Sequence, residues 1–335
     1  MDNVLIIGAG SWGTSFANYL ASKVTPVKIW AKEQEVKDSI QNLNENSLFL
    51  PGIKLSKDLT PVSDLINEVK KADILIFAIP SKYIRNIFLE IKDIVESKNM
   101  INLSKGFEAS SLKTISQVAV EVFGSDIIDK WITISGPSFA KELANNHPTT
   151  VAAASKNEDF LRLIQEKFSS HVLRIYRTDD LTGIEVGGSM KNIMAIASGI
   201  IHGAGYGYNT TASLVTRAIV EISKIGVILG AKKETFWGLA GIGDLMLTCF
   251  GPLSRNFQLG VRIARGESLE EIERSSITIA EGVETTKAIK KLSEKLNIEM
   301  PISNKIFEIL FEGKNPGIAL KELMQRSLKL EWITD

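Results

Sequence analysis

Three glycines near the start of the chain have the spacing of a phosphate-binding turn. Gly8, Gly10 and Gly13 form a G-x-G-x-x-G pattern that follows the apolar residues 4–7 and precedes a helical pattern at 11–21. Such a turn lets the backbone approach a pyrophosphate, and the free N–H groups of the next helix face the anion. The order strand, glycine turn, helix predicts a dinucleotide site; the alternative is an ordinary tight turn.

Polar residues follow three later predicted strands, at the edge where an open α/β sheet binds its ligands. They are Pro80-Ser81-Lys82, Ser104-Lys105-Gly106 and the Ser-Gly-Pro-Ser stretch 135–138. A lysine after a strand is commonly a solvated loop residue, but Lys105 precedes a glycine and shares its edge with the glycine turn. The Gly-Pro-Ser stretch either starts a helix or presents N–H groups to an anion.

A second glycine-rich stretch, Gly187 to Asn192, lies inside a predicted helix. Each glycine there costs roughly 1 kcal/mol relative to alanine. At helical spacing Lys191 shares a face with small residues. Either a ligand lies against this face beside Lys191, or the small residues let two helices pack closely while Lys191 extends to water.

Two further clusters contain charged groups of opposite sign. The turn 238–244 is rich in glycine and ends in Asp244, and Ser254-Arg255-Asn256 places a guanidinium at a predicted helix start. An anion is favoured there by both the guanidinium and the helix. The three histidines and Cys249 lack ligand spacing, so we expect no metal site.

The elements that must position these groups divide the chain into two halves. Strands alternate with amphipathic helices up to about residue 180, which predicts a doubly wound, mainly parallel Rossmann-type sheet. The predicted strands are 4–7, 27–30, 74–79, 100–103, 131–134, 149–154 and 172–176. Beyond residue 180 only helical patterns remain, at 183–201, 209–229, 256–265, 281–296 and 303–311. We therefore expect an α/β domain over 1–180 and an all-α domain over 181–335.

The composition excludes several classes of protein. Lys and Arg number 39, as do Asp and Glu, and this balance argues against a nucleic-acid or acidic-membrane partner. The longest apolar run, 193–201, is too short to span a bilayer. One cysteine and no leader pattern at the N-terminus indicate a cytoplasmic protein. The apolar segment 215–229 suggests a homodimer.

Seven stretches together resemble the bacterial NAD(P)-dependent glycerol-3-phosphate dehydrogenases. They occur in the family's order and span nearly the whole chain: 8–14, 103–106, 135–140, Lys191-Asn192, 238–244 with Thr248, 254–256 and 280–282. The resemblance implies reversible reduction of dihydroxyacetone phosphate to glycerol 3-phosphate, which feeds phospholipid synthesis.

The resemblance also implies a role for individual residues. Lys191 would be the catalytic proton donor and acceptor. The substrate would contact a set drawn from both halves: Lys105, Gly136, Ser138, Asn192, Asp244, Thr248, Ser254, Arg255 and Asn256. The dinucleotide would contact the glycine turn with Ser11 and Trp12, and then Lys105, Ala140, Arg255, Ile279 and Glu281.

The cofactor preference depends on the end of the second predicted strand. An NAD-specific site usually has Asp or Glu there, whereas this chain has Ala31 and Lys32 before Glu33. The family commonly has Arg or His at position 32. A cation at that position favours NADP, so we expect NADPH to be preferred modestly over NADH, with both accepted.

Two other functions fit parts of the pattern. A two-domain dehydrogenase of hydroxyacids or ketopantoate needs a carboxylate clamp, whereas Arg255 and its neighbours favour a phosphorylated triose. A non-catalytic dinucleotide sensor would keep the glycine turn without needing Lys105, Lys191 and Asp244 together.

Overall fold

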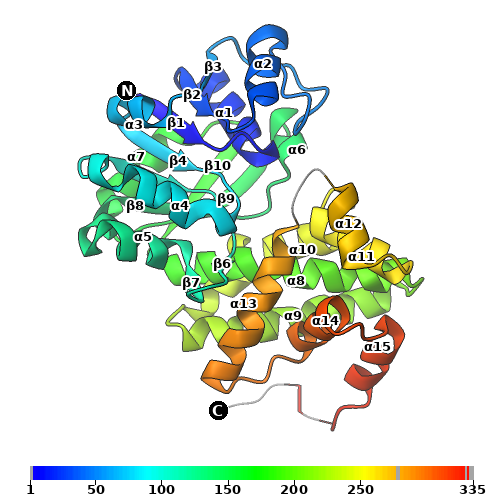
Figure 1. Cartoon of the computed structure of the whole chain (residues 1–335). Helices are drawn as coiled ribbons and strands as arrows, with labels where there is room; N and C mark the ends of the chain where they lie inside the picture. Colours follow the sequence, from blue (N-terminus) through cyan, green and yellow to red (C-terminus); the bar gives the residue numbers. More distant parts are fainter. Residues whose placement is uncertain (1–2, 277–279, 329, 332–335) are drawn as a thin grey trace.

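The computed structural model describes residues 3–276, 280–328 and 330–331. An eight-stranded sheet with helices on its faces forms one part of the molecule, and a group of helices forms the other (Figure 1). The last strand ends at Thr178 and the first helix of the second part begins at Leu181. The predicted change from α/β to all-α structure is confirmed.

The sheet is doubly wound, with strand order β10-β9-β8-β5-β4-β1-β2-β3. All neighbouring strands are parallel except β8 and β9. The chain order reverses beside β1, which pairs with both β2 and β4, so the carboxyl end of β1 is the switch point where such sheets bind ligands. The strands are β1 Val4–Ile7, β2 Val27–Trp30, β3 Leu59–Val62, β4 Ile74–Phe77, β5 Asn99–Asn102, β8 Trp131–Ser135, β9 Thr149–Ala154 and β10 Leu173–Thr178.

Helices cover both faces of the sheet, which explains why β1 is a continuous apolar run. Val4 and Ile6 pack with Phe16 and Phe168, whereas Leu5 and Ile7 belong to a separate cluster with Phe88. The first cluster involves α1 Ser11–Lys23, α2 Gln34–Leu43, α6 Ala140–Ala144 and α7 Glu158–Phe168. The second involves α3 Leu65–Lys71, α4 Ser81–Ile91 and α5 Ile115–Phe123.

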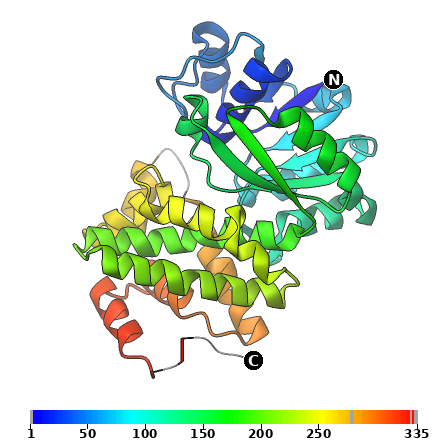
Figure 2. The ribbon, with the colours of Figure 1, turned by 180° about the vertical axis from the view of Figure 1, so that it is seen from behind.

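The helical part is built around α8, Leu181–Gly203, which is buried along most of its length. A helix of small and apolar residues on every side is expected to be surrounded, and Figure 2 shows α8 lying beside α9. The remaining helices are α9 Tyr208–Ile228, α10 Asp244–Phe250, α11 Arg255–Ala264, α12 Leu269–Ser275, α13 Glu281–Leu296, α14 Pro301–Phe311 and α15 Pro316–Met324. Among the helices of the described segments, none has the length and apolar character needed to cross a bilayer.

Several short elements escaped the sequence prediction. Strand β3 contains Pro61 and lies at the sheet edge, where the missing N–H is tolerated. The hairpin of β6, Phe107–Glu108, and β7, Lys113–Thr114, forms a separate two-stranded sheet before α5. Two-residue strands and helices as short as α10 and α12 carry too little periodicity to be recognised.

Candidate active site

The three glycines of the turn after β1 meet different surroundings. Gly8 has φ of +117°, and a Cβ atom there would lie 2.5 Å from the carbonyl oxygen of Ala78. A Cβ atom on Gly13 would lie 2.1 Å from the carbonyl oxygen of Gly8, so this glycine lets α1 sit against the turn. A Cβ atom on Gly10 would meet no atom within 4 Å among the described residues. Gly10 therefore borders open space in which a ligand could lie.

The start of α1 suits an anionic group. Gly10 is the N-cap, no side chain caps the helix, and the first turn contains no acidic residue. The hydroxyl of Ser11 donates to the carbonyl of Phe49 at 2.6 Å, so what Ser11 offers a ligand is its backbone N–H. Trp12 is half-buried and packs on Phe16. These residues fit the pyrophosphate of a dinucleotide, because helix N–H groups remain available there.

A buried cluster of three charges lies between the two parts of the molecule. Asp244, at the start of α10, is fully buried and pairs with Lys191 of α8 through one oxygen. Its other oxygen accepts from Lys105 Nζ at 2.7 Å, and Lys105 follows β5 at the carboxyl edge of the sheet. Two ammonium groups thus share one carboxylate, so the cluster has an excess positive charge. That excess favours an anionic ligand.

Burial has the largest effect on the pKa of Lys191. It lowers the pKa of the ammonium to about 8, Asp244 opposes the shift, and the charge of Lys105 adds to it. A lysine with a pKa near 8 exchanges protons readily close to neutral pH. Burial also raises the pKa of the nearby Cys249 thiol to about 12, so this cysteine is a neutral packing residue.

The glycines beside Lys191 pack against protein and do not border a ligand space. A Cβ atom on Gly187 would lie 2.4 Å from the carbonyl oxygen of Ala240, and one on Gly188 would lie 2.5 Å from Ser135 Oγ. The packing interpretation of these small residues is therefore right. The accompanying expectation that Lys191 extends to water is wrong, because Lys191 is buried against Asp244.

The stretch after β8 brings backbone and hydroxyl groups to the same edge. The carbonyl of Gly136 accepts from Ser138 Oγ at 2.9 Å and lies 3.5 Å from Lys105 Nζ. The carbonyl of Ala140 accepts from Ser15 of α1 at 2.7 Å, which places α6 beside the dinucleotide turn. The Ser135 hydroxyl is buried and finds no partner among the described residues.

The helical side contributes amide, hydroxyl and guanidinium groups. The Nδ2 atom of Asn192 is buried and finds no partner in the described part of the chain, which leaves a donor available to a ligand. Asn256 Oδ1 accepts from the Gly282 N–H at 2.9 Å and so joins α11 to α13. Thr248 Oγ1 donates to the Asp244 carbonyl at 2.6 Å. Ser254 Oγ caps α11, accepting from Phe257 N at 3.2 Å.

Arg255 is exposed at the first position of α11 and lines a hollow of about 460 Å³. Lys82, from the start of α4, borders the same hollow. Glu281 begins α13, where burial raises the pKa of its carboxyl and the charges of Arg255, Lys105 and Lys191 oppose that rise. Ile279, predicted to contact the dinucleotide, lies outside the described residues.

Lys32 is exposed beyond the end of β2, which stops at Trp30 as expected. Its Nζ lies 6.0 Å from the ring centre of Tyr83, in α4. Glu33 is the N-cap residue of α2.

Two residues that hold α8 against the sheet were missed. The buried carboxylate of Glu185 accepts from Ser116 N at 3.0 Å and from Thr133 Oγ1 at 3.1 Å. Ser189 Oγ accepts from Gly106 N at 2.8 Å, next to Lys105. A lone glutamate in a helix of small and apolar residues was the available signal, since a buried carboxylate requires partners.

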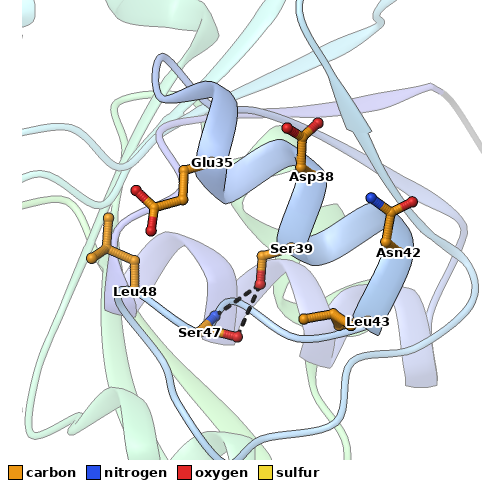
Figure 3. Close-up of a pocket in the computed structure, with 7 residues that line it drawn as sticks. All are labelled: Glu35, Asp38, Ser39, Asn42, Leu43, Ser47 and Leu48. Carbon is orange, nitrogen blue, oxygen red and sulfur yellow. Dashed lines mark hydrogen bonds between the residues drawn. The ribbon is translucent and has the colours of Figure 1, made fainter.

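A second hollow, of about 380 Å³, lies away from the charged cluster. Figure 3 shows it along α2, where Ser39 is joined to Ser47 of the following connector. None of the predicted site residues lines it. Within the described ranges no group of three or more His, Cys, Asp and Glu side chains is arranged to hold a metal ion.

Comparison with known proteins covers both parts of the chain. Residues 3–161 match the N-terminal part of the NAD-dependent glycerol-3-phosphate dehydrogenase family. Residues 180–321 match the C-terminal part of the same family.

Individual relatives extend the match to nearly the full length. The glycerol-3-phosphate dehydrogenase [NAD(P)+] of Citrifermentans bemidjiense is 41% identical over 333 residues, 99% of each chain. That of Leptospira biflexa is 42% identical over 329 residues, which cover 98% of this chain and 99% of the relative. A crystal structure of glycerol-3-phosphate dehydrogenase from Coxiella burnetii superposes with a TM-score of 0.92 at 33% identity, covering 97% of this chain and 99% of that one. The chain therefore belongs to the NAD-dependent glycerol-3-phosphate dehydrogenase family.

Proposed function

We propose that this NAD(P)-dependent oxidoreductase interconverts dihydroxyacetone phosphate and glycerol 3-phosphate, with Lys191 as the proton donor and acceptor. The observation that carries the proposal is the buried pairing of Lys191 with Asp244, next to Lys105. Family membership supplies the reaction, and the cluster supplies the acid–base group that the reaction needs. The product is a precursor for phospholipid synthesis.

Lys191 acts at the oxygen of the reacting carbonyl. A bound NADPH or NADH supplies the hydride that reaches the carbon. Negative charge then develops on the oxygen, and the ammonium of Lys191 stabilises that charge and delivers a proton. In the reverse direction the neutral amine takes the proton from the alcohol, which its pKa of about 8 allows near neutral pH.

Asp244 and Lys105 position Lys191 and set its charge state. Asp244 holds the Lys191 side chain in one place and opposes the loss of its proton. Lys105 lowers the pKa of Lys191 and, as a second cation, attracts the anionic substrate. The unpartnered Asn192 Nδ2 atom supplies a further donor toward the substrate.

The phosphate of the triose binds at the start of α11. Arg255 is exposed at this helix start and can make a charge-assisted pair with the phosphate, and its charge also acts on Glu281. The N–H groups of the first helical turn add to this attraction. Asn256 holds α13 beside this helix start through Gly282, and Ser254 caps it. Gly136, Ser138 and Thr248 complete the pocket.

The dinucleotide binds along the sheet edge. Gly8, Gly10, Gly13, Ser11 and Trp12 hold its pyrophosphate region, and Ala140, Arg255 and Glu281 lie further along. Lys32 lies where a 2′-phosphate would bind and where an NAD-specific enzyme would have a carboxylate. We therefore propose that NADPH is preferred modestly over NADH.

The two binding functions correspond to two domains of the chain. Residues 1–180 form the dinucleotide-binding domain and 181–335 the substrate-binding domain, a division supported by the end of the last strand at Thr178 and the start of the helical part at Leu181. We place the enzyme in the cytoplasm, where reduced nicotinamide cofactors are available, and infer that it acts as a homodimer.

One assay tests the substrate class. Nicotinamide absorbance is followed with dihydroxyacetone phosphate, ketopantoate and a 3-oxoacid as competing substrates. Turnover with dihydroxyacetone phosphate at a kcat/KM at least a hundred times that of the other two is expected. Comparable or faster turnover of ketopantoate or the oxoacid would contradict the proposal.

A further inference from the structure

A buried asparagine lies in the surface connector between α2 and β3. Asn46 is fully buried, whereas the neighbouring Ser47 is exposed. A polar side chain that turns inward from a connector requires partners, because an unpaired buried amide is costly. The partners of its Nδ2 atom lie in the glycine turn and in the first turns of α1.

Both the nitrogen and the oxygen of the Asn46 side-chain amide form hydrogen bonds. Its Nδ2 atom donates to the carbonyl oxygen of Ala9 at 2.8 Å and to Thr14 Oγ1 at 2.8 Å. Its Oδ1 atom accepts from the Phe49 N–H at 3.0 Å. The orientation of the amide is unambiguous, since the Ala9 carbonyl only accepts and the Phe49 N–H only donates.

These bonds orient one peptide unit of the dinucleotide turn. The Ala9 carbonyl also accepts from Thr14 Oγ1 at 3.1 Å, so two donors hold it on the side facing Asn46. In a planar trans peptide the C=O of Ala9 and the N–H of Gly10 point in opposite directions. Holding the carbonyl toward Asn46 therefore directs the Gly10 N–H away from Asn46.

We propose that Asn46 is a positioning residue for dinucleotide binding: by holding the Ala9 carbonyl, it keeps the Gly10 N–H presented to the phosphates. The inference rests on the proposed function, in which this turn binds NADPH or NADH. It concerns the phosphate region shared by both dinucleotides, so its effect is the same for the two.

Other contacts fasten the connector without orienting the turn's peptide. Asn18, further along α1, accepts from the Ser56 N–H at 2.7 Å. Ser39 of α2 bonds to Ser47 on the outer side of the connector (Figure 3). Asn18 is the matched control for Asn46, because it is an asparagine that hydrogen-bonds to the same connector and not to the Ala9 carbonyl.

The experiment measures dinucleotide affinity by calorimetry, without triose phosphate, in the full-length enzyme. Asn46→Ala is expected to raise the Kd for both NADPH and NADH about tenfold, with kcat at saturating dinucleotide within about twofold of wild type. Asn46→Asp keeps an acceptor for Phe49 but loses the donors to Ala9, so its Kd is also expected to rise. Asn18→Ala is expected to lower the melting temperature while leaving both Kd values within about twofold.

Three outcomes would overturn the inference. The first is a wild-type Kd in Asn46→Ala, and the second is a wild-type Kd in Asn46→Asp. The third is a rise in Kd in Asn18→Ala as large as that in Asn46→Ala. If both Asn46 variants fail to fold, Thr14→Val removes the other donor to Ala9 and one of the two acceptors of Asn46 Nδ2, with little change in shape. A rise in Kd is then expected, and an unchanged Kd would overturn the requirement that the Ala9 carbonyl be held. A wild-type protein that binds neither dinucleotide would contradict the proposed function itself.

Discussion

The glycine turn and the Lys191–Asp244–Lys105 cluster work by different means. The turn is a short contiguous segment that acts through its backbone, and open space beside Gly10 is what makes it a binding site. The cluster joins side chains separated by 53 and 139 residues, and burial determines its chemistry. A backbone site is thus specified locally, whereas an acid–base site depends on charges that only the packed fold brings together.

The largest expected effect separates catalysis from cofactor binding. Lys191→Ala should lower kcat at least ~10²-fold, because it removes the positioned acid–base group. Asp244 keeps Lys105 as its partner, so the fold should survive. The dinucleotide Kd should remain within about twofold, since the turn does not use this side chain. Lys224→Ala, at an exposed position of α9, is the control; near-normal turnover of Lys191→Ala would contradict its assignment.

Arg255→Ala tests whether the helical side recognises the phosphate. Loss of a charge-assisted contact should raise the KM for dihydroxyacetone phosphate by ~10–100-fold. Turnover of unphosphorylated dihydroxyacetone should hardly change. Arg262, which lines the same hollow but is already paired with Glu267, provides the matched control. Equal weakening of both substrates would show that Arg255 does not bind the phosphate.

The pH dependence tests the buried cluster directly. Reduction needs the protonated ammonium of Lys191, so its kcat should fall about tenfold per pH unit above about 8. Oxidation needs the neutral amine and should rise with pH to a plateau above the same value. Because the charge of Lys105 lowers the pKa of Lys191, Lys105→Met should move both limbs to higher pH. If the two pH–kcat profiles of Lys105→Met change at the same pH as those of the wild type, the charge of Lys105 does not set the pKa of Lys191.

The turn can be divided into a ligand glycine and a packing glycine. Gly10→Ala should raise the dinucleotide Kd about tenfold while leaving the melting temperature nearly unchanged, because its Cβ would enter open space. Gly13→Ala should instead destabilise the fold by ~1–3 kcal/mol, since its Cβ would collide with the Gly8 carbonyl. Thermal melts and calorimetry on the two variants test this. A lower melting temperature in Gly10→Ala with an unchanged Kd would contradict its assignment as the ligand glycine.

The smallest effect concerns the choice of dinucleotide. Lys32→Ala should lower the NADPH-to-NADH ratio of kcat/KM about fivefold, the scale of one exposed ion pair. Lys23→Ala, at an exposed position near the end of α1, should leave the ratio alone. A wild-type preference for NADH, or an unchanged ratio in Lys32→Ala, would rule out this role.

The sequence by itself determined the elements that have strong periodicity or a contiguous signature. The apolar run 4–7, the glycine spacing after it and the disappearance of strand patterns near residue 180 were sufficient for the α/β sheet followed by helices. Strand β3 could not be predicted from the sequence because it is only four residues long and contains Pro61. Its pairing with β2 comes from the sheet and not from local preference.

Only the tertiary structure decided how the charged residues are arranged. The sequence contained Lys105, Lys191 and Asp244, but their sharing of one carboxylate depends on how α8 and α10 pack on the sheet edge. It also left two explanations for the glycines before Lys191, and their contacts with Ala240 and Ser135 identify packing as the reason. Burial, which lowers the pKa of Lys191, is a property of the assembled surroundings, and no local pattern of residues encodes it.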